Sequence, residues 1–271
     1  DRIWKVVLLH KFHDILPGSS IGWVHREAEA TYAALTAELE GLIDVALAAI
    51  ASGDAVDGAP LLANAAPHER DEVVVLDGEA ASAIAVVSEP APDAIAVQRL
   101  GEGGVALWAS LPALGFGRPR AAEGHRPVHV TVGEVVPAIL DNGVLRVTLG
   151  PDGCLTSLIA VGSGRELIAE GGRVGLPQLH HDLPYEYDAW DIEEYYRHRV
   201  TDLDEVESIR VTDSGPLLAR VAVHRRFRAS TLTQTFELRA GSDRVDVHVE
   251  LDWHERDHLL KLAWPLDLLC A

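Results

Sequence analysis

The chain has 271 residues, of which 48% are hydrophobic, and its 42 acidic residues outnumber 23 basic ones to give a formal net charge of −19. This length is enough for two or more domains with apolar cores, and the composition excludes wholesale disorder. A surface this negative repels phosphate backbones and anionic lipids, so we expect no nucleic acid or membrane partner. No apolar run approaches the roughly 18 residues that a membrane-spanning helix requires.

Residues 1–53 are predicted to form two antiparallel helices joined by a short turn. Apolar residues share one face of the first helix, which cannot continue through Pro17. Ser19 or Ser20 is expected to cap the second helix. The second helix has an apolar stripe with the three- and four-residue spacing of an amphipathic helix. The stripe comprises Ala28, Tyr32, Leu35, Leu39, Leu42 and Ala46.

From residue 54 the pattern changes to short apolar segments separated by turns rich in Gly, Asp and Pro. We interpret residues 54–132 as a small β-sandwich or β-barrel unit. Its strands are expected at residues 73–76, 83–87, 94–100, 107–111 and 128–132.

Residues 133–271 are predicted to form a larger antiparallel β-region. Two apolar segments between residues 144 and 159 flank the tight turn at Asp152 and Gly153, which predicts a hairpin. Three later segments alternate apolar and polar residues, as half-buried antiparallel strands do. These segments are residues 219–227, 230–238 and 244–252.

The two cysteines, Cys154 and Cys270, lie far apart and have no CxxC spacing. This arrangement argues against a zinc ribbon and against a disulfide framework. We expect two reduced thiols in a cytoplasmic protein.

Residues 12–21, with the sequence Phe-His-Asp-Ile-Leu-Pro-Gly-Ser-Ser-Ile, place a histidine and a carboxylate just before a rigid Pro-Gly turn. On local chemistry alone, His13 could simply cap carbonyls at a helix C-terminus. As a string, however, the ten residues closely resemble the metal-binding segment of family 38 glycoside hydrolases, the class II α-mannosidases. Residues 187–192 and 253–261 also resemble the family, in the same order along the chain.

The resemblance implies roles for His13 and Asp14. The family holds a buried zinc-type ion with two histidines and two aspartates, and by position His13 is one metal ligand while Asp14 contacts the sugar. His10 lies three residues earlier and could share a helix face with His13, but the family supplies its other ligands from a different domain. That domain would precede Asp1 and carry the nucleophile and the acid/base, so no catalytic residue is expected here. The complete enzyme would hold a divalent metal, expected to be zinc, whereas one ligand is too few for this chain alone.

Residues 185–196 combine aromatic rings with carboxylates. Sugar sites use this combination because rings stack on C–H faces and carboxylates accept hydroxyl hydrogen bonds. An acidic surface loop with buried aromatic anchors would have the same composition. The resemblance favours a loop near the active site, with Asp188, Trp190 and Asp191 binding substrate.

A second histidine cluster, His180-His181-Asp182, is predicted to be a loop with one residue packed and one solvated. Adjacent side chains on an extended segment point to opposite faces and so rarely bind one ion together.

The resemblance implies an α+β multidomain fragment: an antiparallel helical hairpin (1–53), a small β-sandwich unit (54–132) and part of a large antiparallel β-sandwich (133–271). The chain begins without Met and ends in an apolar run, and we therefore interpret it as a piece excised from a longer enzyme. That enzyme would be a metal-dependent retaining α-mannosidase that hydrolyses terminal α-mannosidic bonds of mannose-containing oligosaccharides. We expect the fragment alone to be inactive. We also expect it to self-associate as a homo-oligomer, through the surface that the missing N-terminal catalytic domain would cover and through sheet strands left unpaired after Leu251.

The alternative hypothesis is a non-catalytic carbohydrate-binding or scaffolding β-sandwich module. The two hypotheses differ in what they expect of His13 and Asp14. The enzyme hypothesis expects both side chains to be exposed on a surface that meets another domain. The alternative expects them to be buried or paired within this chain.

Overall fold

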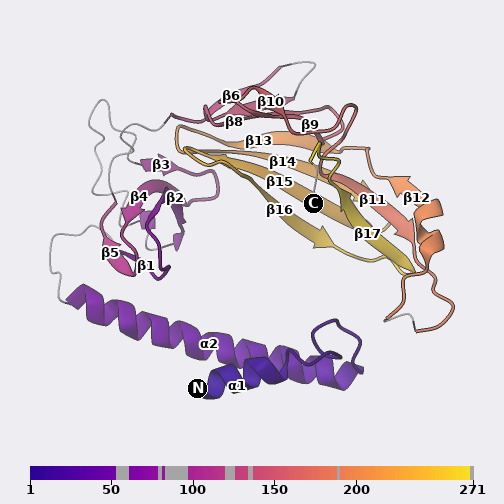
Figure 1. Ribbon diagram of the computed structural model, residues 1–271, viewed down its shortest axis with the longest axis horizontal. Helices are drawn as coiled ribbons and strands as arrows, with labels where there is room; N and C mark the ends of the chain where they lie inside the picture. The colour runs from indigo at the N-terminus through magenta and orange to yellow at the C-terminus, as the bar shows by residue number, and fades with distance from the viewer. Residues whose placement is uncertain are drawn as a thin grey trace. The chain divides into compact units, whose positions relative to one another are not determined.

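The computed structural model describes residues 1–52, 61–78, 81–82, 97–119, 126–133, 137–187 and 190–268 (Figure 1). They divide into two compact units. Unit 1 comprises Asp1–Asp57 and Asp182–Tyr196, and unit 2 comprises Gly58–His181 and Arg197–Ala271. Among the described residues, no helix is both long enough and apolar enough to cross a membrane.

The helical part of unit 1 consists of α1 (Arg2–Leu9) and α2 (Gly22–Ser52). Arg2 forms an ion pair with Glu38, while the ring of His10 lies 5.2 Å from that of Tyr32. The two contacts run in opposite senses along the helices, so the predicted antiparallel hairpin is confirmed. The predicted apolar stripe of α2 is fully buried only at Ala28 and Leu35, and several of its other members are exposed.

The first part of unit 2 is built around one central strand, β4. Two small sheets, with orders β2-β4-β3 and β1-β5, make up this part. The strand β4 is buried on both faces, which accounts for its nearly continuous apolar sequence. The strand expected at 83–87 lies outside the described residues. The bounds are β1 (Leu62–Asn64), β2 (Arg70–Leu76), β3 (Val97–Arg99), β4 (Val105–Leu111) and β5 (Gly115–Gly117).

A five-stranded antiparallel sheet follows, with the order β10-β9-β8-β7-β6. The predicted hairpin is confirmed, since β8 and β9 pair directly around the turn at Gly153. The strand expected near 128–132 is β6, and it pairs with β7 rather than with β2–β4. The bounds are β6 (His129–Thr131), β7 (Ala138–Asp141), β8 (Leu145–Leu149), β9 (Leu155–Ala160) and β10 (Arg165–Glu166).

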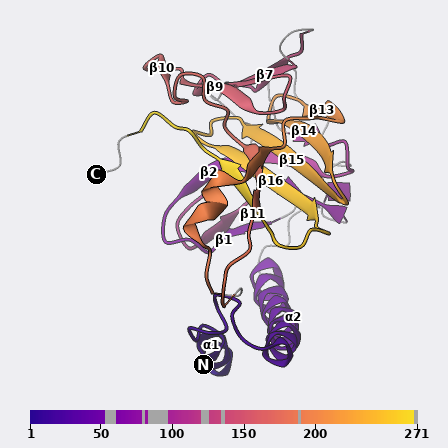
Figure 2. The ribbon, with the colours of Figure 1, turned by 90° about the vertical axis from the view of Figure 1, so that its right-hand side faces the viewer.

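The remaining strands of unit 2 form a four-stranded sheet, β13-β14-β15-β16, and a three-stranded sheet, β12-β11-β17. The three strands predicted between 219 and 252 are confirmed as β14, β15 and β16. Figures 1 and 2 show the five-stranded sheet lying over the four-stranded sheet. The bounds are β11 (Leu176–His181), β12 (Val200–Asp202), β13 (Ser208–Ser214), β14 (Leu218–Phe227), β15 (Ser230–Arg239), β16 (Val245–Asp252) and β17 (His258–Ala263). The 3₁₀ helix η1 (Glu194–His198) begins in unit 1 and ends in unit 2.

One hydrophobic core joins these sheets. It takes Trp108 from β4, Leu140 and Val147 from the five-stranded sheet, and Val221 and Phe236 from the four-stranded sheet, all at most 3% exposed. Residues alternate between the two faces of each strand, so Val223 of β14 and Leu238 of β15 also enter this core, whereas Phe227 and Leu232 belong to a separate small cluster. Burial of this apolar area is the main source of stability for unit 2.

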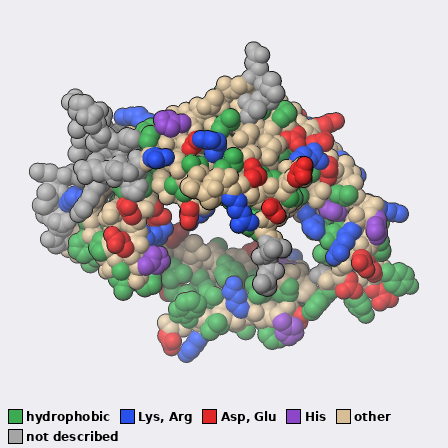
Figure 3. Space-filling model, turned by 45° about the horizontal axis from the view of Figure 1, so that its top comes forward, with side chains coloured by type: hydrophobic (Ala, Val, Ile, Leu, Met, Phe, Trp, Pro, Cys, Tyr) green, Lys and Arg blue, Asp and Glu red, His purple; other side chains and the backbone are tan. Residues whose placement is uncertain are grey.

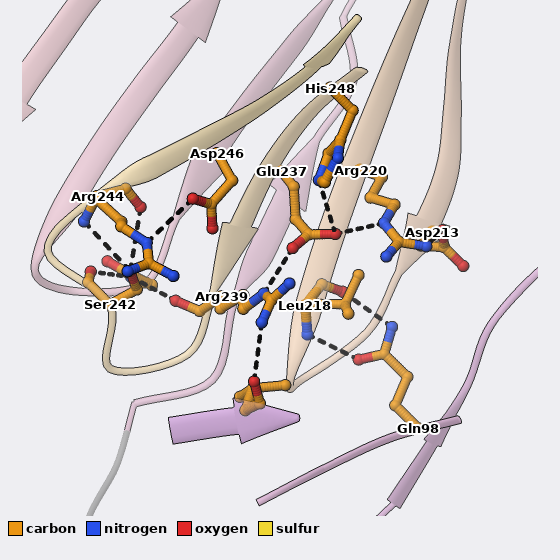
Figure 4. A network of polar contacts seen from close by, with 12 residues as sticks. Gln98, Asp213, Leu218, Arg220, Glu237, Arg239, Ser242, Arg244, Asp246 and His248 are labelled. Atoms are coloured by element: carbon orange, nitrogen blue, oxygen red, sulfur yellow. Dashed lines mark hydrogen bonds and ion pairs between the residues drawn. The ribbon is translucent and has the colours of Figure 1, made fainter. Parts of the chain in front are cut away.

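A polar network also connects the small sheets to the four-stranded sheet (Figure 4). Glu237 of β15 is fully buried and accepts hydrogen bonds from Arg220 and Arg239, each at 2.5 Å. Arg239 donates in turn to the carbonyl of Val73 in β2 at 3.0 Å. The side chain of Gln98 in β3 bonds to the backbone of residues 217–218 at 2.8–2.9 Å. Burial alone would raise the pKa of Glu237, but the two arginines outweigh this effect and hold the pKa below its usual value.

Candidate functional site

The candidate site is the turn that connects α1 to α2. After α1 the backbone continues as a series of hydrogen-bonded turns, in which Ile15 and Leu16 both donate to the carbonyl of Phe12, at 2.9 and 3.0 Å. Gly18 then adopts a left-handed conformation with φ of 85° and donates to Ile15 at 3.1 Å. A residue with a Cβ would be strained at Gly18, so the Pro-Gly pair fixes where the chain reverses.

The two serines stabilise this turn differently from the prediction. They were expected to cap α2, but α2 begins only at Gly22. The hydroxyl of Ser20 instead donates to the carbonyl of Asp14 at 2.7 Å, and Ser19 approaches the same oxygen at 3.4 Å. A ring nitrogen of His25 lies 2.9 Å from the carbonyl of Ser20. The backbone of Asp14 is therefore held in place by the two serines that precede α2.

This arrangement leaves His13 and Asp14 facing solvent. The His13 side chain is 71% exposed and that of Asp14 is 42% exposed, with 3.7 Å between Nε2 of the imidazole and Oδ2 of the carboxylate. The ring of Phe12 lies 4.2 Å from that of His13. The separation is too long for a hydrogen bond, so Asp14 does not fix which ring nitrogen of His13 is protonated. Both side chains remain accessible to a ligand.

His10 occupies a different environment. It follows α1 directly, is buried, and packs its ring against Tyr32. Its Nδ1 is buried without a hydrogen-bond partner among the described residues. His10 therefore belongs to the interface between the helices, whereas His13 faces solvent, and the two do not form a metal-binding pair.

The chemistry of His13 fits a metal ligand, because an exposed imidazole is a common donor for zinc-type ions. Within the described part of the chain, no group of three or more His, Cys, Asp or Glu side chains is arranged to hold an ion. His13 would therefore need further ligands from residues other than these.

The segment Asp182–Tyr196 belongs to the same compact unit as the helices. It contains a tight turn at Tyr187, which has a φ of 56° and whose carbonyl accepts from Trp190 and Asp191 at 2.7 and 2.9 Å. Trp190 is 60% exposed and Tyr185 is still more exposed, so these rings are not buried anchors of a surface loop. Asp191 is exposed as well. Asp188 lies outside the described residues.

The cluster His180-His181-Asp182 does not form the predicted loop. His180 and His181 are the last two residues of β11, with His180 buried and His181 half-buried. The prediction failed because the pairing of β11 with β17 extends to His181 and His258, whose rings meet edge to face at 5.1 Å. Strand pairing of this kind is a long-range property that local sequence does not reveal.

The turn is surrounded by exposed apolar side chains, which the sequence pattern did not predict. Phe12, Leu16, Ile21 and Trp23 are all more than half exposed. Hydrophobic side chains gather over the helices of unit 1 (Figure 3). Most of the apolar stripe predicted for α2 is exposed as well, since only Ala28 and Leu35 of its members are buried.

The fold is thus a helical hairpin joined to stacked antiparallel sheets, and its candidate site is an exposed imidazole–carboxylate pair suited to metal or sugar binding. Residues 1–50 match the model of the alpha mannosidase middle domain, and residues 140–269 match that of the glycosyl hydrolases family 38 C-terminal domain. Together these matches cover more than half of the chain, in the order in which the units occur. The chain belongs to glycosyl hydrolase family 38.

Similar proteins carry related names. The chain is 32% identical to the proteins named Alpha-mannosidase 2C1 of Mus musculus and of Homo sapiens, over 98% of its own length in both cases. It is 23% identical to Alpha-mannosidase G of Dictyostelium discoideum over 96% of its length. The chain spans 24% of the length of the first two relatives and 27% of the third.

Proposed function

We propose that this chain is part of a metal-dependent, retaining α-mannosidase that acts on terminal α-mannosidic bonds of mannose-containing oligosaccharides in the cytoplasm. The observation that carries this proposal is the exposure of His13 and Asp14 on a hydrogen-bonded turn. This turn lies within the residues that match the alpha mannosidase middle domain. The names of the three relatives agree with an activity on α-mannosides.

In this proposal the turn contributes one side of the active site. His13 would hold a zinc-type ion, which would supply Lewis-acid contacts to sugar hydroxyls when it is bound. Asp14 would accept hydrogen bonds from the sugar, and its backbone is positioned by the serine hydroxyl that binds its carbonyl. Trp190 and Asp191 belong to the same unit and would contribute an apolar ring face and a further hydroxyl acceptor.

The proposal assigns the chemical steps to other residues. A retaining mechanism needs a carboxylate nucleophile and a separate acid/base. The turn offers one carboxylate, that of Asp14, and the proposal assigns both catalytic groups to a domain preceding this chain. That domain would cover the exposed apolar side chains around the turn. The chain by itself is therefore proposed to be inactive.

The alternative function, a carbohydrate-binding or scaffolding module, expected His13 and Asp14 to be buried or paired. The two side chains lie within ion-pair distance of each other, but neither is buried, and the 71% exposure of His13 favours the enzyme proposal instead.

Kinetics and metal content of a longer protein that carries this chain test the proposal. With an aryl α-mannoside, His13→Ala should lower kcat/KM at least 100-fold and reduce the bound metal, since loss of even an indirect metal contact costs roughly 10–100-fold. Asp14→Asn should lower kcat/KM while the metal remains bound. The matched control is His254→Ala, because His254 is also exposed and lies 2.9 Å from a carboxylate, that of Asp252.

Two results would overturn the proposal. One is a His13→Ala protein that keeps the metal content and activity of the unmodified enzyme. The other is turnover by the purified 271-residue chain alone that is lost on His13→Ala, which would place the catalytic groups within these residues.

A further inference from the structure

Unit 2 contains a cavity of about 370 Å³ between its small sheets and the turn that joins β15 to β16. Strands β1, β2 and β4 supply most of its wall, and Arg239 and Arg244, on either side of that turn, supply the rest. The wall is held together within unit 2, because β2 pairs with β4 along its whole length and Arg239 donates to the carbonyl of Val73 at 3.0 Å. A cavity of this size suits a small molecule, since ligand sites measure roughly 300–1,000 Å³.

Among the described residues, three arginines and a single carboxylate line the cavity. The arginines are Arg70, Arg239 and Arg244, and the carboxylate is that of Glu72. This balance is the reverse of that of the whole chain, in which 42 acidic residues outnumber 23 basic ones. Glu72 pairs with Arg70 at 2.5 Å, so it does not neutralise the other two arginines.

The carboxylates that hold Arg239 and Arg244 do not line the cavity. The buried Glu237 accepts from Nε of Arg239 at 2.5 Å, and Asp246 accepts from Nε of Arg244 at 3.0 Å (Figure 4). A guanidinium bound through Nε keeps the N–H groups of its terminal nitrogens. Apart from the bond of Arg239 to Val73, these groups have no protein acceptor in the part of the chain that the structure describes. Because both side chains line the cavity, we expect these donors to meet an acceptor placed inside it.

Much of the remaining wall is apolar. It includes Leu62, Val74, Ala109 and Leu111, which belong to the hydrophobic cluster of the small sheets. An apolar wall lowers the local dielectric constant and so strengthens the attraction between a guanidinium and an anion. The side chain of Arg239 is only 23% exposed and is already held by two hydrogen bonds, so a ligand would not need to order it first.

We propose that this cavity binds a small molecule through an oxyanion group, a phosphate or a carboxylate, which Arg239 and Arg244 hold by charge-assisted hydrogen bonds. The N–H groups of a guanidinium form a fork that matches the oxygens of both kinds of group. The body of the ligand would lie against the apolar wall. The inference goes beyond the mannosidase proposal and is independent of it, since it uses no residue of unit 1.

Isothermal titration calorimetry of a longer protein that carries this chain tests the proposal, with inorganic phosphate and acetate as separate probes. The anion that binds more tightly identifies the class of ligand. Arg244→Gln should raise its dissociation constant roughly 3- to 30-fold, the scale of one partly exposed charge-assisted hydrogen bond. Glu72→Gln should lower the dissociation constant instead, because it removes the carboxylate from the wall and releases Arg70. Both side chains are partly exposed, so neither change should unfold the protein.

Arg226→Gln is the matched control for Arg244→Gln. Arg226 is 59% exposed and bonds through Nε to Glu207 at 3.0 Å, but it does not line this cavity. Glu205→Gln controls in the same way for Glu72→Gln, since Glu205 is exposed and lies outside the cavity. Both controls should leave anion binding unchanged.

Three results would overturn the proposal. The first is that neither anion binds, and the second is that Arg244→Gln and Glu72→Gln leave binding unchanged. The third is binding by the 271-residue chain that the longer protein lacks, because other residues would then fill the cavity.

Discussion

Replacing Glu237 by Gln tests whether the buried charge network holds the small sheets to the four-stranded sheet. The carboxylate has no exposed surface and bonds to Arg220 and Arg239 at 2.5 Å each. An amide keeps the shape but offers only one acceptor oxygen, and its N–H groups point at a guanidinium. One arginine therefore loses its bond to residue 237, and both lose the charge of Glu237, although Arg239 keeps its bond to Val73 and Arg220 keeps Asp213 at 3.5 Å.

The expected cost follows from these contacts. Removing one partner from a buried ion pair typically destabilises a protein by about 3–5 kcal/mol. Arg220 and Arg239 are 18% and 23% exposed and can recover some hydration, so we expect about 2–4 kcal/mol for Glu237→Gln. Urea unfolding followed by tryptophan fluorescence measures this difference. Glu205→Gln is the control, because Glu205 is exposed, and it should change the free energy of unfolding by less than about 0.5 kcal/mol.

The loss of stability caused by Glu237→Gln should depend on pH in a direction that the pKa of Glu237 determines. Because the folded-state pKa of Glu237 lies below its usual value of 4.5, the carboxylate contributes stability above that value and loses it as pH falls through the lower folded-state pKa. The difference between the parent chain and Glu237→Gln should stay constant from about pH 6 to 8 and shrink below about pH 4. A difference under 1 kcal/mol at pH 7, or one that grows in acid, would refute the reasoning.

Three further substitutions probe the packing of unit 2. Burial raises the pKa of the Cys154 thiol to about 12, so in a Cys270→Ser variant a disulfide reagent should modify native Cys154 at least 100-fold more slowly than the unfolded chain. Gly153→Ala should cost roughly 1–3 kcal/mol more than Gly171→Ala in urea unfolding, because both glycines have positive φ but only at Gly153 would a Cβ meet a neighbouring side chain, at 2.4 Å. Phe236→Ala should cost about 3–5 kcal/mol in the same assay, and a cost below 2 kcal/mol would mean that the layers do not pack at this residue.

The fold was largely predictable because its signals are local. The spacing of apolar residues in 1–53 and the alternation along β14, β15 and β16 each depend on a few neighbouring residues. The hairpin around Gly153 was equally clear, since Asp and Gly favour a tight turn. Pairing between distant strands was not predictable in this way. The partner of β6 and the extension of β11 through His181 depend on residues far away in the sequence.

The burial of Glu237 also depends on residues far away in the sequence and was not predictable from local pattern. Alternation places Glu237 on the polar face of β15, where it would be exposed in an isolated sheet. It is buried because the small sheets lie against that face, through the bonds of Arg239 to Val73 and of Gln98 to residues 217–218. A residue's face can be read from its strand, but what covers that face cannot.

At the candidate site, in contrast, the exposure of the side chains agrees with what the sequence led us to expect. The family was identifiable from residues 12–21, and the matches to the alpha mannosidase middle domain and to the family 38 C-terminal domain confirm it. The roles of His13 and Asp14 stay predictions, yet their exposure has a clear physical origin. The turn is rigid because Gly18 reverses the chain and Ser20 holds the carbonyl of Asp14. Support of this kind is ordinary turn chemistry, so it explains why the backbone is ordered and is not itself evidence of a binding role. In the proposal above, this order lets the turn present both side chains to a ligand without a further cost of ordering the backbone.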